Sequence, residues 1–362
     1  MKNEITKLGL SAVLFCIFLS CGRDKVNEDL FSKESFKSRM DVRDGRPILF
    51  DDLFLGQPKT ITFHPDSFLV IEEMEAPRLI KILDLKNNKI QELIPRGRGP
   101  GEMLVAWGVK VIDKDIFLFC GQLSKVIILT MTNDRHFVID DEFYIEEKQS
   151  QRLIPMSHDK FVCLSAIGDE KRFSVLTGGG EIIKKFGEYP SFINDNEVEP
   201  NNDIFLSVID AKPGGRLFVA VCMKSDLFEI YDLEVGLRRR FQGPLGFKFS
   251  VETQSMGGGY MLRPVPHYLT YRTLIAGENE FWAGYIGHKW EPGKVVPLTE
   301  QCTKEIFCFD WEGKPLRILS LEYPAIHFDF DWKGNILYAL ELRENDPVIA
   351  AYSLDTSLPD SK

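Results

Sequence analysis

The amino-acid sequence predicts an all-β fold, a six-bladed β-propeller of four-stranded antiparallel blades. Beyond Cys21, apolar residues occur in short alternating or continuous runs broken by Gly, Asn and Asp, with no convincing helical period. Turn sequences recur at intervals of about 46, 46, 56, 77 and 43 residues, and they centre on Asn88, Asp134, Gly180, Gly236, Gly313 and Thr356. Radial repetition of four-stranded sheets buries both faces of each sheet and leaves few open edges, so it is the economical architecture.

Six apolar runs are predicted to be the second strands of successive blades. Each is followed by another strand and a turn whose Gly or Asn residues tolerate the positive φ of tight hairpins. The runs begin at Phe68, Ile116, Lys160, Arg216, Glu280 and Ile336.

The two ends of the propeller are expected to meet in the last blade. After the run that starts at Ile336, one further strand is visible, so the blade lacks its outermost strand. Residues 46–50 can supply it, which would close the ring with N- and C-terminal strands. The longest interval, between Gly236 and Gly313, contains an insertion over residues 245–266, because this segment offers too few strand-like runs for a hidden blade.

The N-terminus predicts export and lipid anchoring. Lys2 and Lys7 flank an apolar run over residues 8–19, which is too short for a membrane-spanning helix and has the length of a signal-peptide core. The sequence that ends in Ser20 and Cys21 resembles the lipobox of bacterial lipoproteins, although Phe18 stands where Leu is usual. The expected organisation is a signal peptide over 1–20, a lipidated N-terminus at Cys21 with a flexible tether over 21–45, and the propeller over 46–362. The alternative is an ordinary secretory peptide.

The charge of the chain restricts its partners. A net charge of −10 and a pI near 5.3 disfavour a surface that neutralises nucleic-acid phosphates. We therefore expect no nucleic-acid partner, membrane contact only through the N-terminal lipid, and a monomer.

The sequence GRGPGE, residues 97–102, raises the question of a phosphate-binding loop. Such a loop needs a helix directly after it, with the anion at the helix N-terminus, but here the chain leads into another strand. A crossover between the first two blades is the better interpretation, because glycine permits tight backbone paths and Pro100 fixes one φ.

This hexapeptide resembles the G-x-G-P-G-E signature of the TolB-like, NHL-related six-bladed β-propeller lipoproteins of Gram-negative bacteria. The resemblance extends over about residues 46–358, with this motif as its one specific element. It implies the propeller fold and an envelope location, and it implies little about function, because the function of that family is largely undefined.

Metal-binding spacing is not visible in the sequence. The six histidines show no H-x-H or H-E-x-x-H pattern, and the oxygen-rich loop over residues 194–203 lacks the glycine of an EF-hand loop. We predict no metal site and no cofactor. Ca²⁺ in the central channel stays open as an alternative, with Glu102, Asp203 and Asp210 as candidate carboxylates.

The candidate ligand-binding residues lie in and after the insertion. The insertion combines flexible glycines with residue types that are enriched at binding surfaces, and an aromatic cluster follows it in the same blade. The predicted ligand-binding residues are Tyr260, Met261, Arg263, His267, Trp282 and Tyr285.

The predicted function is a membrane-tethered, non-enzymatic binding module for a protein, peptide or glycan, located at the cell envelope and on the outer membrane. No nucleophile or catalytic set is visible, so the catalytic residues are unknown. The alternative is a divalent-ion-dependent hydrolase or lactonase with its site at the central channel. A structural accessory of an outer-membrane assembly is a third, narrower hypothesis.

Overall fold

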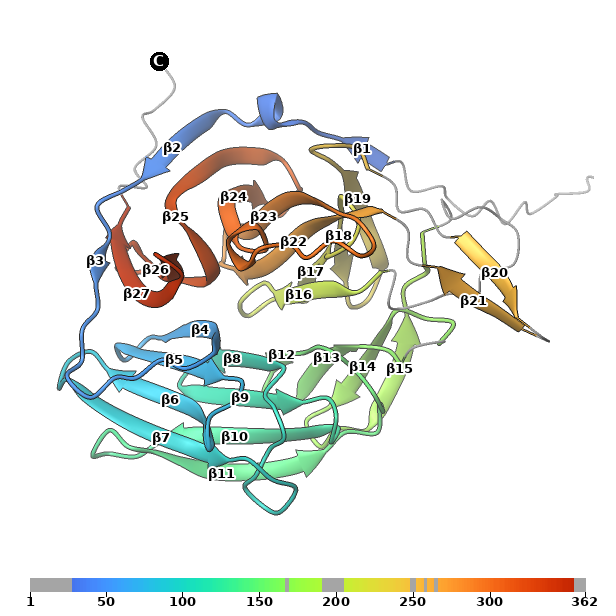
Figure 1. The fold of residues 1–362 in the computed structure, drawn as a ribbon. Helices are drawn as coiled ribbons and strands as arrows, with labels where there is room; N and C mark the ends of the chain where they lie inside the picture. The colour runs from blue at the N-terminus through green and yellow to red at the C-terminus, as the bar shows by residue number, and fades with distance from the viewer. Residues whose placement is uncertain are drawn as a thin grey trace, which may run out of the picture.

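The computed structural model describes residues 28–166, 169–190, 205–247, 252–256, 259–263 and 266–354, and for 252–263 it describes the backbone alone (Figure 1). The expected signal peptide, Cys21 and the oxygen-rich loop over 194–203 lie outside these residues. Within the described part of the chain, no helix has the length and apolar character needed to cross a membrane.

The described chain is all-β, as predicted, and its sheets are arranged around a centre like the blades of a propeller (Figure 1). Its helical elements are two short 3₁₀ turns, η1 (Lys33–Ser35) and η2 (Leu298–Glu300). Four blades are sheets of their own, and each runs from the innermost to the outermost strand in chain order. They comprise β4 (Pro58–His64), β5 (Phe68–Glu73), β6 (Arg78–Asp84) and β7 (Lys89–Pro95); β8 (Gly108–Ile112), β9 (Asp115–Cys120), β10 (Lys125–Met131) and β11 (Phe137–Tyr144); β12 (Leu153–Ser157), β13 (Lys160–Leu164), β14 (Phe173–Thr177) and β15 (Ile182–Phe186); and β16 (Ser207–Ala211), β17 (Leu217–Cys222), β18 (Leu227–Asp232) and β19 (Gly236–Gln242).

The strands after the insertion form one continuous eight-stranded sheet, so the expectation of six separate sheets holds for four of them. The sheet is continuous because β25 pairs with β24 through its first part and with β26 through its second part. Its 17 residues contain no glycine or asparagine that would end the strand. The sheet comprises β22 (His267–Ala276), β23 (Glu280–Trp290), β24 (Thr303–Asp310), β25 (Pro315–Asp331), β26 (Ile336–Arg343), β27 (Asp346–Ser353), β3 (Arg46–Pro47) and β2 (Ser38–Val42).

The N-terminal segment closes the ring and also wraps around its outside (Figure 1). Strand β3 pairs antiparallel with β27, Pro47 opposite Ala350, so part of the predicted 46–50 segment supplies the missing outer strand. Before it, β2 pairs in parallel with β25, and β1 (Glu28–Leu30) pairs in parallel with β19.

The expectation of a flexible tether over residues 21–45 is therefore corrected for its described part. The outer edges of β19 and β25 present unpaired N–H and C=O groups, and β1 and β2 satisfy them. Phe31, Phe36 and Val42 anchor the segment because their side chains are buried against the neighbouring sheets.

All six apolar runs predicted as second strands are strands, namely β5, β9, β13, β17, β23 and β26. Their side chains are almost completely buried, since each lies between two neighbouring strands of its own sheet and faces the next sheet on either side. The core is therefore distributed between the blades rather than gathered at one centre.

The GRGPGE segment is a structural crossover between β7 and β8, as predicted. The Glu102 carboxylate accepts a hydrogen bond from Gly99 N at 2.8 Å, and Glu142 Oε2 accepts one from Gly101 N at 2.5 Å. The Lys125 ammonium is fully buried and donates to the carbonyls of Gly99 (2.8 Å) and Glu102 (3.0 Å). These backbone N–H groups are thus occupied by the protein's own carboxylates, so they do not form a phosphate cradle.

The insertion contains a separate two-stranded hairpin, β20 (Glu252–Met256) and β21 (Gly259–Arg263). In Figure 1 it lies outside the ring, beside the outer part of the blades. It adds no blade, in agreement with the sequence-based expectation.

Candidate functional site

A pocket of about 1330 Å³ lies at the centre of the ring. Its walls are the innermost strands of the sheets, which contact one another in the order β4, β8, β12, β16, β22 and β25 and then return to β4. All six strands contribute side chains, and loops at both ends of these strands extend the lining. A site at this position can draw on residues that are far apart in the sequence.

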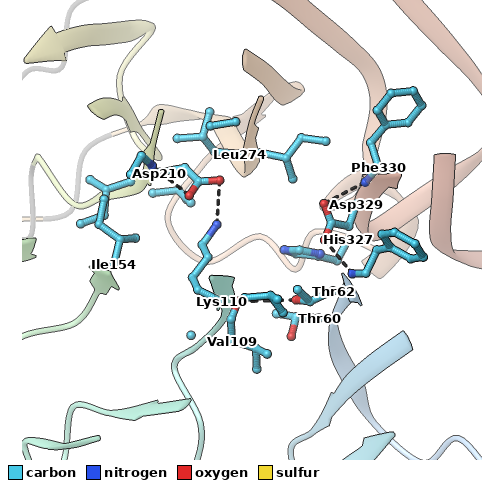
Figure 2. Close-up of a pocket in the computed structure, with 18 of the residues that line it drawn as sticks. Thr60, Thr62, Val109, Lys110, Ile154, Asp210, Leu274, His327, Asp329 and Phe330 are labelled. Atoms are coloured by element: carbon cyan, nitrogen blue, oxygen red, sulfur yellow. Dashed lines mark hydrogen bonds and ion pairs between the residues drawn. The ribbon is translucent and has the colours of Figure 1, made fainter. Parts of the chain in front are cut away.

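An ion pair crosses one part of the pocket. The Lys110 Nζ on β8 lies 2.8 Å from Asp210 Oδ2 on β16, and Figure 2 shows the two side chains pointing toward each other. Burial raises the pKa of Asp210, and the ammonium of Lys110 opposes this shift. The pair therefore balances its own charge inside the pocket.

Asp329 and His327 approach from β25 (Figure 2). The two oxygens of Asp329 accept hydrogen bonds from the backbone N–H groups of Phe63 (2.7 Å) and Phe330 (2.8 Å). Burial raises the pKa of Asp329 to about 6. His327 Nδ1 donates to the carbonyl of Ile61 at 3.0 Å, and burial, followed by the charge of Lys110, lowers its pKa to about 3. The ring is therefore neutral near pH 7.

Three further cationic side chains line the pocket from different inner strands or their ends. Lys59 on β4 donates to Glu72 Oε1 and to the carbonyl of Ala106, each at 3.0 Å. Arg152 stands directly before β12, and Arg272 lies on β22. Burial, and secondarily the charges of both arginines, lower the pKa of Lys59 in spite of Glu72. Positive charge is therefore concentrated in this part of the pocket.

Apolar side chains form the wall between these polar groups. Val109, Ile154 and Leu274 lie on three different inner strands and surround the charged groups in Figure 2. A pocket with a mainly apolar wall and a few fixed polar groups is the usual form of a ligand site.

Two of the sequence-predicted ligand-binding residues are corrected. Trp282 is completely buried against Phe330, at 4.3 Å between ring centroids, and Tyr285 is 3% exposed with its hydroxyl 3.1 Å from Asp226 Oδ1. Both lie on β23, a second strand whose side chains fill the spaces between sheets, so neither lines the pocket.

The other four predicted ligand-binding residues have different outcomes. His267 begins β22 and its ring packs against Trp290, with centroids 4.7 Å apart. The side chains of Tyr260, Met261 and Arg263 on β21 lie outside the described part of the structure. Of the six predicted residues, three have side chains that the structure describes, and none of these lines the central pocket.

The three carboxylates that were candidates for a metal site in the channel do not lie together. Asp210 lines the pocket, Glu102 belongs to the blade crossover, and Asp203 lies outside the described residues. Among the residues that the structure describes, no group of three or more His, Cys, Asp or Glu is placed to hold a metal ion. Asp210 is engaged by an ammonium and Asp329 by two backbone donors, so these residues do not fit a divalent cation.

Sequence reasoning missed the cationic residues of the pocket wall, although a signal for three of them exists. Lys59, Arg152 and Arg272 occur in PKTIT, QRLIP and YRTLI, where a basic residue stands at or near the start of an apolar run. These runs are the innermost strands. Aligning the first strand of each blade would have brought the three cations together.

Comparison with known proteins agrees with the fold. A family model described as TolB-like 6-blade propeller-like matches residues 38–333. Among solved structures, a member of the DUF4221 family from Bacteroides vulgatus superimposes with a TM-score of 0.58 at 13% identity, over 86% of this chain and 96% of that chain. A protein from Bacteroides fragilis that is described as exported gives a TM-score of 0.52 at 11% identity, over 89% and 98% of the two chains. A search of curated proteins finds no match.

Proposed function

This chain belongs to the TolB-like 6-blade propeller-like family, and from that premise we propose that it is a non-enzymatic binding module whose ligand site is the central pocket. The ligand class is a peptide or glycan segment, presented by a partner or free. Family membership supports the fold alone, because propellers host many unrelated functions. The proposal therefore depends on the pocket itself.

The observation that carries the proposal is a preformed cavity of about 1330 Å³ whose wall combines apolar side chains with immobilised polar groups. The Lys110–Asp210 pair fixes one polar position and the two backbone donors to Asp329 fix another. Polar groups that are held in place recognise a ligand at a low cost in conformational entropy. This arrangement favours recognition of an extended ligand over a flat protein–protein contact.

We also propose that the eight-stranded sheet represents two blades joined through β25, which gives six blades in total. The ring of six inner strands supports this count. On this view G-x-G-P-G-E is the family signature of the first blade crossover, with Lys125 as its internal partner.

The cellular setting stays a proposal as well. We propose that the protein is exported, lipidated at Cys21 and held at the outer membrane by that lipid. Its signal-like N-terminus and its similarity to a protein described as exported support this view. Cys21→Ala is expected to abolish lipid labelling and to release the protein from membranes, and retention of both would contradict the anchor.

The binding proposal is tested with a panel of short peptides and oligosaccharides, scored by the shift in the thermal unfolding midpoint. Val208→Trp places an indole into the pocket from β16, and Ile183→Trp adds the same group at an exposed position on β15. We expect ligands that stabilise the parent and Ile183→Trp but not Val208→Trp. Ligands that stabilise all three proteins equally, or a panel without any stabilising member, would contradict a site in the pocket.

The metal-dependent hydrolase is the weaker proposal, because the pocket carboxylates already have protein partners. Ca²⁺ in the same thermal assay is expected to leave the unfolding midpoint unchanged. A Ca²⁺-dependent rise that disappears in Asp210→Asn would reverse this preference.

A further inference from the structure

The charged groups of the central pocket divide into those with a protein partner and those without one. Lys110 is paired with Asp210, and Lys59 is paired with Glu72. Arg152 donates to the carbonyl of its neighbour Gln151 at 2.8 Å. Neither Arg152 nor Arg272 forms an ion pair with a carboxylate in the described part of the chain. The two guanidiniums therefore differ from Lys59 and Lys110.

The two arginines act on the same space. Both line the pocket, and the charge of each lowers the pKa of Lys59, which burial lowers most. Burial lowers the pKa of Arg152, and the charge of Arg272 adds to this effect against the opposing charge of Glu72. Among the described residues, these three cations thus share the Glu72 carboxylate, which leaves an excess of two positive charges.

Such an excess of positive charge is unfavourable in a desolvated site that lacks a counter-charge. Like charges in a partly desolvated site repel each other, and no described side chain compensates the two guanidiniums. A guanidinium presents a planar fork of N–H donors that matches the oxygens of a carboxylate or a phosphate. The chemistry of the two guanidiniums therefore matches an oxyanion.

Other apolar residues of the same pocket specify the rest of the ligand. An apolar wall is formed by Val111, Val208 and Ile326, which line the pocket from three inner strands and are only partly buried. We infer that the pocket binds an organic anion, whose carboxylate or phosphate lies between Arg152 and Arg272 and whose uncharged body lies along this apolar wall. The inference rests on the proposed binding function and narrows its ligands to acidic ones.

The test compares two fluorescent probes that share an aromatic body. Anilinonaphthalene sulfonate carries an anionic group, and phenylnaphthylamine carries none. Both are titrated into the purified protein, the double variant Arg152→Met with Arg272→Met, and the control Arg216→Met. Arg216 is an exposed arginine away from the pocket, 2.9 Å from Asp232.

The expected result is that the double variant loses affinity for the sulfonate by about tenfold, because two charge-assisted contacts disappear. The affinity of the double variant for phenylnaphthylamine should stay within about twofold of the parent value. The affinities of Arg216→Met for both probes should do the same. Val208→Trp should weaken the binding of both probes, which would locate their binding site in the pocket.

The two proposals fail in different ways. Equal binding of the sulfonate to the parent and the double variant, with both probes still blocked by Val208→Trp, overturns the oxyanion site and leaves the binding module intact. If Val208→Trp blocks neither probe, or if neither probe binds the parent, the pocket is not a ligand site and both proposals fall.

A competition arm identifies the oxyanion. Naphthoate and naphthyl phosphate present a carboxylate and a phosphate on a comparable ring system, and naphthalene methanol is the neutral reference. We expect at least one of the two anions to displace the sulfonate better than the alcohol does, and the stronger competitor names the group. Equal displacement by all three compounds would show that charge is not recognised, which overturns the inference.

Discussion

The blade crossover and the central pocket both contain cationic side chains, and they differ in how many partners these side chains have. In the crossover, the buried Lys125 ammonium has three oxygen partners, namely the carbonyls of Gly99 and Glu102 and the carboxylate of Glu142 at 2.7 Å. In the pocket, Arg152 has a single described carbonyl partner, and Arg272 is exposed to the cavity without an ion pair among the described residues.

The difference separates charges that serve the fold from charges that are available to a ligand. The glycine-rich motif looks like an anion site in the sequence, but its donors are used internally and its cation is saturated. The inner strands look unremarkable in the sequence, yet they hold the unbalanced cations. The number of hydrogen-bond and ion-pair partners of a charged group therefore indicates its role here better than a glycine-rich sequence does.

The largest expected effect comes from replacing Lys125, whose ammonium has three oxygen partners. Lys125→Met should lower the free energy of unfolding by about 3 kcal/mol, because it leaves buried carbonyls and the Glu142 carboxylate without their donor. Urea unfolding followed by tryptophan fluorescence measures this loss. The same variant should bind the pocket probes with unchanged affinity.

Lys114→Met is the matched control for this prediction. Lys114 is 69% exposed in its side chain and lies 3.3 Å from Asp66, so its ion pair is screened by water. A loss of less than about 0.5 kcal/mol is expected. If Lys125→Met were as mild as this control, the crossover would not depend on its internal cation.

A smaller effect, with opposite pH dependence, is expected from two carboxylates, one paired with a cation and one in the pocket. Asp84, at the turn between β6 and β7, receives two 2.8 Å hydrogen bonds from Arg135, which outweigh burial and hold its pKa well below its usual value. Asp329 in the pocket forms no ion pair with the residues that the structure describes, and burial raises its pKa to about 6.

The sign of each contribution follows from proton linkage. For Asp84 the folded state holds the proton less tightly, so its stabilisation is present above the ordinary pKa of about 3.8 and fades on further acidification. For Asp329 the folded state holds the proton more tightly, so its contribution is greatest below about pH 4 and is lost as the pH rises through about 6.

Urea unfolding of Asp84→Asn and Asp329→Asn between pH 3 and pH 8 measures both trends. The free-energy difference between the parent and Asp84→Asn should grow with rising pH. The difference for Asp329→Asn should shrink by on the order of 1 kcal/mol from pH 4 to pH 7. Parallel curves for the two variants would mean that the charge of Asp329 in the pocket is compensated as well as that of Asp84, which is paired with Arg135.

Much of the fold could be predicted because local signals determine it. Alternating apolar runs, tight-turn residues and their spacing identify all six second strands, and the last blade's missing strand points to residues 46–50, of which Arg46 and Pro47 pair with β27. The N-terminal wrapping could not be predicted, because the polar segment that contains β1 and β2 is ordered by the open edges of β19 and β25, which are distant in the sequence. Local composition carries no information about such edges.

The candidate site was harder to predict, for a related reason. Asp210 was identified, but its partner Lys110 lies 100 residues earlier, and only the ring of inner strands brings them together. The aromatic residues Trp282 and Tyr285 attracted attention because such side chains are common at binding surfaces, yet their strand lies between sheets. Assigning each strand its radial position is the step that separates core aromatics from pocket residues.

The smallest expected effect comes from replacing Arg272, which forms no ion pair with the described residues. Arg272→Met should change the free energy of unfolding by no more than about 0.5 kcal/mol, because the exposed guanidinium has no described ion pair to lose. At low salt the variant should be slightly more stable than the parent, since repulsion with Arg152 and Lys59 is relieved, and the gain should disappear at high salt. Urea unfolding at both salt concentrations, with Arg216→Met as the control, measures this difference. A loss above about 1 kcal/mol would show that Arg272 serves the fold as Lys125 does, and the distinction between the two regions would no longer hold.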